Sequence, residues 1–135
     1  MLKGPSRYFL IAILSSLSFF GCASSSTMFP VHEEVLVFPL PMDLVYLRTL
    51  EAVDLHPDWE LDRTIKEKGL IYLRNLRYSS FADADRRTAT LVIKHVGPRE
   101  TSIQLAPDSQ TVVGGDELLV LIKQHLSGEP SRKNP

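Results

Sequence analysis

Cysteine is nearly absent from this 135-residue sequence, in which Cys22 is the only one. A single thiol cannot form an intramolecular disulfide, so disulfide bonds are excluded as a source of stability. A surplus of positive charge is absent too, because 15 Lys and Arg stand against 16 Asp and Glu. Domains that bind nucleic acids carry basic patches, so this balance argues against a nucleic-acid partner.

Long apolar stretches are also missing. The most apolar stretch, Tyr8–Phe20, has 13 residues, whereas a membrane-spanning helix needs about 20. It follows Lys3 and Arg7 and is followed directly by Gly21. A positive start, a short apolar region and a small residue before the cleavage point form the pattern of a secretory signal peptide. Residues 1–21 are therefore predicted to be an export signal rather than a permanent span.

The segment around the single cysteine resembles a known processing motif. Ser18-Phe19-Phe20-Gly21-Cys22 is similar to the lipobox of bacterial lipoproteins, in which a small residue precedes a cysteine that is lipidated and becomes the new N-terminus. The resemblance implies a lipid anchor on Cys22, and two acyl chains are enough for stable membrane attachment. Ala23 follows the cysteine, at the position where an Asp would signal retention in the inner membrane. The resemblance therefore implies the outer membrane of a cell with two membranes, facing the periplasm.

The rest of the chain is long enough for one domain. Small and polar residues from 23 to Pro30 indicate a flexible tether, so residues 22–30 are predicted to be the lipidated cysteine and its linker. Residues 31–126 carry the periodic apolar pattern of a single domain. The tail 127–135 contains Gly, two Pro and mixed charges and is predicted to be disordered.

The first half of this domain predicts a strand, a helix and a second strand. Val35–Phe38 is a β-rich apolar run ended by proline, and Asp43 is expected to cap a helix that runs to about Leu55. The apolar face of that helix is expected to contain Tyr46, Leu50 and Val53, with Leu47 alongside. From Trp59 to Lys66 apolar and polar residues then alternate, as in a half-buried strand, although Arg63 interrupts the apolar side.

The second half predicts three more strands and a final helix. The strands are expected at Leu70–Tyr78, at Thr88–Val96 and around Thr101–Leu105, separated by a turn at Lys68-Gly69, a polar loop from Ser79 to Arg87 and a turn at Gly97-Pro98. After Gly114-Gly115, Asp116 is expected to cap a helix whose apolar stripe consists of Leu118, Leu119, Ile122 and Leu126.

This order, β-α-β-β-β-β-α, predicts an α+β fold. Short turns make neighbouring strands antiparallel, and two helices can cover one face of the sheet to give a two-layer sandwich. Behind a lipobox, this order is similar to the helix-grip domains of small envelope lipoproteins, including those in the C component of the outer-membrane β-barrel assembly machine. The resemblance covers roughly Val31–Leu126 and includes Gly69-Leu70-Ile71, Thr101-Ser102-Ile103 and Gly114-Gly115-Asp116. A shared topology does not determine function.

Residues able to bind metal or anions are scattered through the sequence. The histidines at positions 32, 56, 95 and 125 lack the i, i+4 or clustered spacing of zinc sites. Asp83 and Asp85 are followed directly by two arginines, which favours local charge compensation. Asp116 and Glu117 place negative charge where the helix after Gly114-Gly115 would otherwise attract a phosphate. We therefore expect neither a metal nor another cofactor.

Catalytic patterns are equally weak. The sequence contains no nucleophile elbow, and Asp54, His56, Asp58 and Glu60 are close along the chain without forming a recognisable catalytic set. A non-enzymatic role is therefore expected.

The strand from Leu70 to Tyr78 is the most unusual segment. Leu70, Tyr72, Leu76 and Tyr78 fall on one side with Arg74 between them, whereas Ile71 and Leu73 fall on the other. Two interpretations stay open here. Tyr72 and Tyr78 could flank the core with Phe81 packed under the loop. Alternatively, Tyr72, Arg74 and Tyr78 could bind a protein on the face away from the helices, because Tyr and Arg are common interface anchors.

The sequence as a whole favours a lipid-anchored, non-enzymatic interaction or assembly module whose partner is another envelope protein. The alternative is a periplasmic binding module that holds a lipid or another small apolar ligand between the helices and the sheet.

Overall fold

The structure is a computed structural model that describes residues 30–78 and 86–128. Several positions named above lie outside these residues: the signal segment 1–21, Cys22, the linker up to residue 29, Phe81, Asp83, Asp85 and the tail from residue 129.

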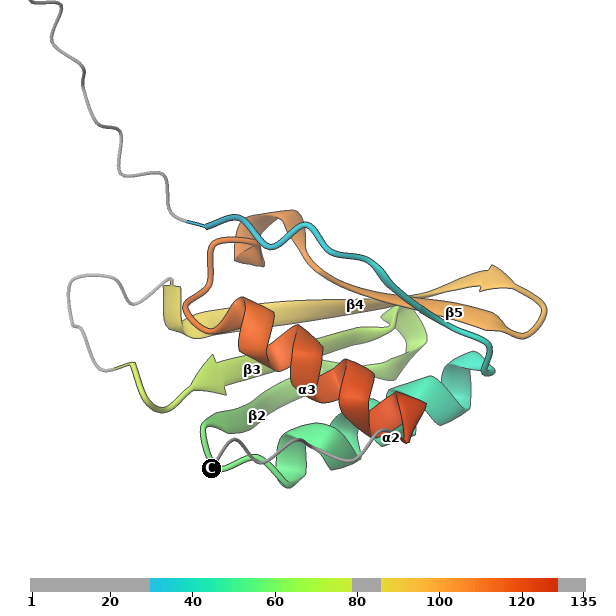
Figure 1. Ribbon diagram of the computed structural model, residues 1–135, viewed down its shortest axis with the longest axis horizontal. Coiled ribbons are helices and arrows are strands. Elements are labelled where there is room, and N and C mark those ends of the chain that lie inside the picture. Colours follow the sequence, from blue (N-terminus) through green and yellow to red (C-terminus); the bar gives the residue numbers. More distant parts are fainter. Residues whose placement is uncertain (1–29, 79–85, 129–135) are drawn as a thin grey trace, which may run out of the picture.

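Five strands form one antiparallel sheet in the order β1-β5-β4-β3-β2. The elements are β1 (Leu36–Phe38), α2 (Met42–Asp54), β2 (Trp59–Ile65), β3 (Leu70–Asn75), β4 (Thr88–Gly97), β5 (Glu100–Leu105) and α3 (Gly115–Ser127), with short 3-10 turns η2 (Lys66–Lys68) and η4 (Pro107–Ser109). Strands β2 to β5 follow one another as a meander, and β1 pairs with β5 at the far edge. Both helices lie on one side of this open sheet (Figure 1). The predicted α+β fold and its element order are confirmed.

The core lies between the helices and one face of the sheet. Strand residues that alternate along β3, β4 and β5 are almost fully buried there, and they meet buried residues of both helices. The members with at most 1% exposure include Ile71, Leu73, Leu91, Ile93, Ile103, Leu105, Val45, Val53, Leu118 and Ile122. Burying one such side chain contributes about 1.5–3 kcal/mol. A ligand held between the two layers would have to displace these side chains.

The N-cap of each helix lies two residues before the predicted cap. Pro41 is the N-cap of α2 and has extended backbone angles, with φ −66° and ψ 150°. Gly114 is the N-cap of α3 and has a φ of 77°, a conformation that glycine adopts at little cost. Asp43 and Asp116 were therefore wrongly predicted as caps. They lie in the first turns, where their carboxylates interact favourably with the helix dipoles.

The buried face of α2 also differs from the prediction. Thr49 is fully buried and its hydroxyl donates a hydrogen bond to the carbonyl oxygen of Val45, at 2.7 Å. Leu47, predicted to lie alongside the buried face, is 54% exposed. The reason is that α2 packs against both the sheet and α3, so the buried stripe is centred on Val45, Thr49 and Val53 at four-residue spacing.

A β-bulge in β2 explains the arginine that interrupts the apolar pattern. Leu61 pairs with Leu73, but Arg63 pairs with the very next residue of β3, Tyr72, so one extra residue lies between them in β2. Such an insertion shifts the alternation by one position. Arg63 therefore lies on the face away from the helices, together with Tyr72. Of the apolar residues in the predicted half-buried strand, Trp59 is buried and Ile65 is partly buried, but Leu61 is 45% exposed.

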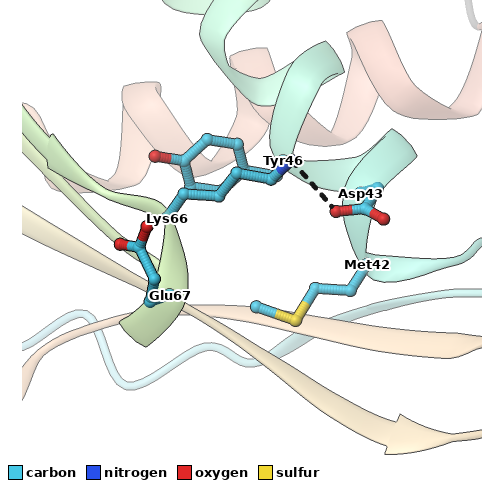
Figure 2. A pocket seen from close by; sticks show the side chains of 5 residues that line it. All are labelled: Met42, Asp43, Tyr46, Lys66 and Glu67. Carbon is cyan, nitrogen blue, oxygen red and sulfur yellow. Dashed lines mark ion pairs between the residues drawn. The ribbon is translucent and has the colours of Figure 1, made fainter.

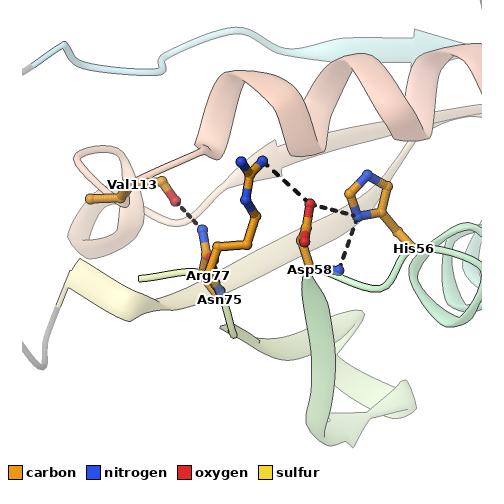
Figure 3. A network of polar contacts seen from close by, with 5 residues as sticks. All are labelled: His56, Asp58, Asn75, Arg77 and Val113. Atoms are coloured by element: carbon orange, nitrogen blue, oxygen red, sulfur yellow. Dashed lines mark hydrogen bonds and ion pairs between the residues drawn. The ribbon is translucent and has the colours of Figure 1, made fainter. Parts of the chain in front are cut away.

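Strand β3 ends at Asn75, three residues before its predicted end (Figure 3). The buried Asn75 amide donates a hydrogen bond to the carbonyl oxygen of Val113 at 2.8 Å, and its side-chain oxygen accepts one from the backbone N–H of Arg77 at 3.0 Å. These two bonds fix the chain in a bend after the strand. At the other end of the domain, α3 continues to Ser127, which was predicted to begin the tail. Neither helix described here is long and apolar enough to span a membrane.

Candidate functional site

The structure describes only part of what was predicted to matter for function. Cys22 lies outside the described residues, so the proposed lipid attachment stays a prediction. Tyr72, Arg74 and Tyr78 are described, and the structure places two of them together.

Tyr72 and Arg74 lie on the face of the sheet opposite the helices. They alternate along β3 with Ile71 and Leu73, which are buried in the core. Tyr72 is half-buried, and the guanidinium carbon of Arg63 lies 4.3 Å from the centroid of its ring. This cation–π contact contributes about 0.5–1 kcal/mol at an exposed site. It orients the tyrosine ring on a face that the other described elements leave uncovered.

Arg74 is held by two acidic side chains of the neighbouring strand. Its guanidinium lies 3.1 Å from a carboxylate oxygen of Asp62 and 3.7 Å from one of Glu60. All three side chains are about half exposed, so each ion pair contributes at most about 1 kcal/mol. The two carboxylates thus share the single positive charge of Arg74 and hold its side chain in place on the surface.

Tyr78 does not join this face. It follows the end of β3 and lines hollows at the start of α3, together with Val113 and Gly114. The sequence-based grouping of Tyr78 with Tyr72 assumed that the strand continued, and the bend fixed by Asn75 ends it. The open face of the sheet therefore contains Tyr72, Arg74 and Arg63, the last of which was not predicted to lie there.

A polar network fixes the junction between β2, β3 and α3 (Figure 3). The Nδ1 atom of His56 accepts a hydrogen bond from the backbone N–H of Asp58 at 3.3 Å. A carboxylate oxygen of Asp58 lies 3.8 Å from the same nitrogen and 3.5 Å from the Arg77 guanidinium. These groups satisfy one another across the turn before β2. The network stabilises the local structure, and its polar side chains are engaged with one another rather than available as nucleophiles.

The remaining histidines are dispersed. His95 contacts the carbonyl oxygen of Gly97 at 3.1 Å, and His125 lies 3.6 Å from a carboxylate oxygen of Glu51. The backbone N–H of His32 bonds to the carbonyl oxygen of Gln110. Within residues 30–78 and 86–128, no group of three His, Cys, Asp or Glu side chains is arranged to hold a metal ion.

A small hollow of about 280 Å³ separates the first turn of α2 from η2 (Figure 2). The Lys66 ammonium and the Asp43 carboxylate form an ion pair across it at 3.3 Å. The ring of Tyr46 lies along one wall, opposite Met42. The Tyr46 hydroxyl is buried and has no hydrogen-bond partner among the described residues. The exposed ion pair shows that this hollow is open to water rather than shaped as an enclosed site.

A larger apolar hollow lies between the end of α2 and β2, and sequence reasoning missed it. We call it the α2–β2 groove, and its volume is about 420 Å³. Its lining consists of Leu50, Val53, Asp54, His56, Pro57, Trp59, Glu60, Leu61 and Leu76. Leu61 and Leu76 were both expected to help bury their strands, but they are 45% and 52% exposed. The signal available in the sequence was that both leucines lie near an end or an edge of the predicted sheet.

Comparisons with known proteins give this site no family context, because no family model matches the chain and no characterised protein is detectably similar in sequence.

Proposed function

We propose that this chain is a lipid-anchored, non-enzymatic envelope lipoprotein that acts as an interaction or assembly module. The anchor is Cys22, which follows a positive start, a short apolar stretch and Gly21. The attachment faces the periplasm from the outer membrane, and the partner is another envelope protein. The anchor leaves residues 31–126 free to present their surfaces to proteins.

The observation that carries the interaction role is the uncovered face of the sheet. Both helices pack on the opposite face (Figure 1), and Tyr72 and Arg74 are presented on the uncovered one at the centre of β3. Contacts with Arg63, Asp62 and Glu60 orient these two side chains. Aromatic and arginine side chains that are oriented before binding lose less entropy when a partner docks, which suits them as interface anchors.

The anchor is tested by radiolabelled palmitate incorporation in cells. The native chain should take up the label, Cys22→Ser should not, and the neighbouring Ser24→Ala variant should behave like the native chain. A label that persists in Cys22→Ser would contradict the proposed attachment site.

The partner surface is tested by photocrosslinking from Thr90, which pairs with Tyr72 across the open face. A photoreactive amino acid there should form an adduct with an envelope protein. The double variant Tyr72→Ala with Arg74→Ala should remove most of that adduct. Arg99→Ala, in an exposed turn, serves as the control and should leave the adduct in place. An adduct unchanged by the double variant, in a chain that still folds, would rule out this surface.

A further inference from the structure

The α2–β2 groove combines an apolar floor with exposed leucines. Trp59 and Val53 form buried parts of its lining, whereas Leu61 and Leu76 expose about half of their surfaces at its rim. Leu55, which lies between two lining residues in the sequence, is 73% exposed. Single exposed apolar residues are ordinary, but several around one hollow mark an interaction site.

The charged side chains that line this groove and its continuation are mainly acidic. Asp54 and Glu60 line it, and a second hollow that shares His56 is lined by Asp116 and Glu117 of α3 together with the exposed Val120. Among the residues that the structure describes, no Lys or Arg lines either hollow. Glu60 forms an ion pair with Arg74, which Asp62 also shares. Arg77 lines another hollow together with Asp116 and Glu117. Four carboxylates, those of Asp54, Glu60, Asp116 and Glu117, thus lie near two arginines, Arg74 and Arg77, so the groove and its continuation carry surplus negative charge.

The shape and charge decide what kind of occupant fits. Pockets for small ligands enclose most of the ligand surface, whereas the leucines at this rim are about half exposed. An added β-strand is disfavoured on β2, because the bulge before Arg63 and the charged residues around it protect this edge. An amphipathic helix can place its apolar side in a hydrophobic groove and its charged side at the rim. An acidic rim selects positive charge on that helix.

We propose that the α2–β2 groove binds a basic, amphipathic helical segment of a partner protein. This inference rests on the proposed role as an interaction module and gives that role a specific partner chemistry. The apolar side chains of the segment lie against Trp59, Leu61 and Leu76. Its Lys or Arg side chains lie near Asp54 and Glu60, and those of its next turns near Asp116 and Glu117.

The test uses the full chain in cells, with a photoreactive phenylalanine analogue in place of Leu76. The control position is Val96, which is 53% exposed against 52% for Leu76 and lies on the β4–β5 hairpin at the opposite end of the sheet (Figure 1). The crosslinked peptide is sequenced by mass spectrometry. We expect an adduct from position 76, absent from position 96, with a segment in which Lys or Arg flank apolar residues at helical spacing.

Charge reversal provides the decisive comparison. Asp54→Lys with Glu60→Lys should lower the yield of this adduct about tenfold or more, because like charges would then face each other. Glu33→Lys with Glu34→Lys changes the net charge equally at exposed positions outside the groove lining and should leave the yield unchanged. The proposal is overturned by an adduct that survives the reversal, by an acidic or uncharged captured segment, by an adduct with lipid or a second copy of this chain, or by no adduct.

The outcome separates this inference from the proposed function. An adduct from Thr90 on the open face without one from position 76 overturns only the groove inference. The absence of adducts at both positions overturns the interaction role as well. Loss of palmitate labelling in Cys22→Ser tests the anchor independently of either surface.

Discussion

Replacing Asn75 by alanine should destabilise the domain more than any loss of surface charge near it. The change removes two hydrogen bonds, to the carbonyl oxygen of Val113 and from the backbone N–H of Arg77. A typical hydrogen bond contributes about 1 kcal/mol net, and a buried partner left unsatisfied costs more, so we expect a loss of about 2–3 kcal/mol. That is a large part of the roughly 5–15 kcal/mol that stabilises most domains.

The measurement is urea denaturation of the full chain in mild detergent, followed by the fluorescence of Trp59. This is the only tryptophan, it is buried, and it pairs with Asn75 across β2 and β3. Arg77→Ala is the matched control, because it keeps the backbone N–H and removes only an exposed ion pair with Asp58. It should cost less than about 1 kcal/mol. If Asn75→Ala cost no more than Arg77→Ala, the argument that Asn75 fastens the end of β3 would be refuted.

The same urea assay checks three further predictions. Gly69→Ala should lower the free energy of unfolding well beyond Gly128→Ala: both glycines have positive φ, but an added methyl at Gly69 would overlap the carbonyl oxygen of Ile93, whereas at Gly128 no atom of the described residues lies within 4 Å. Equal losses would contradict this steric explanation. Tyr46→Phe should raise the free energy of unfolding by about 1 kcal/mol, because it removes a buried hydroxyl that has no partner in residues 30–78 and 86–128, and a loss of stability would show that the hydroxyl is satisfied in solution. Ile122→Ala should cost about 2–5 kcal/mol, since Ile122 is fully buried; a loss below about 1 kcal/mol would argue against this packing.

The apolar patterns predicted the order of elements well because they record burial directly. Ile71 and Leu73, for example, lie on either side of Tyr72 in the sequence. Both point into the core, whereas Tyr72 lies on the opposite face of the sheet. What the patterns could not locate was the bulge in β2. The interruption at Arg63 was visible in the sequence. Only the pairing of Leu61 with Leu73 and of Arg63 with Tyr72 shows that an extra residue there shifts which side chains point to which face of the sheet.

Local signals failed where distant residues decide the outcome. Asp43 and Asp116 are good helix caps by residue type, yet Pro41 and Gly114 take the cap positions. Asn75 resembles any polar residue in a strand, and its partner Val113 is far away in the sequence. The α2–β2 groove depends on the same kind of long-range packing, so its residues could not be grouped from the sequence.

The position of β1 has a consequence for how the chain folds. Leu36 pairs with Ile103, so α2 and three strands lie between the two partners along the chain. Each strand from β2 to β5 pairs with the strand next to it in the sequence, whereas β1 must close a much longer loop to reach β5. Although β1 is the first strand in the sequence, it is thus expected to be the last to pair with the sheet. Until then the hydrogen-bonding groups of β5 are open, and a chaperone that shields this edge would protect the chain during assembly.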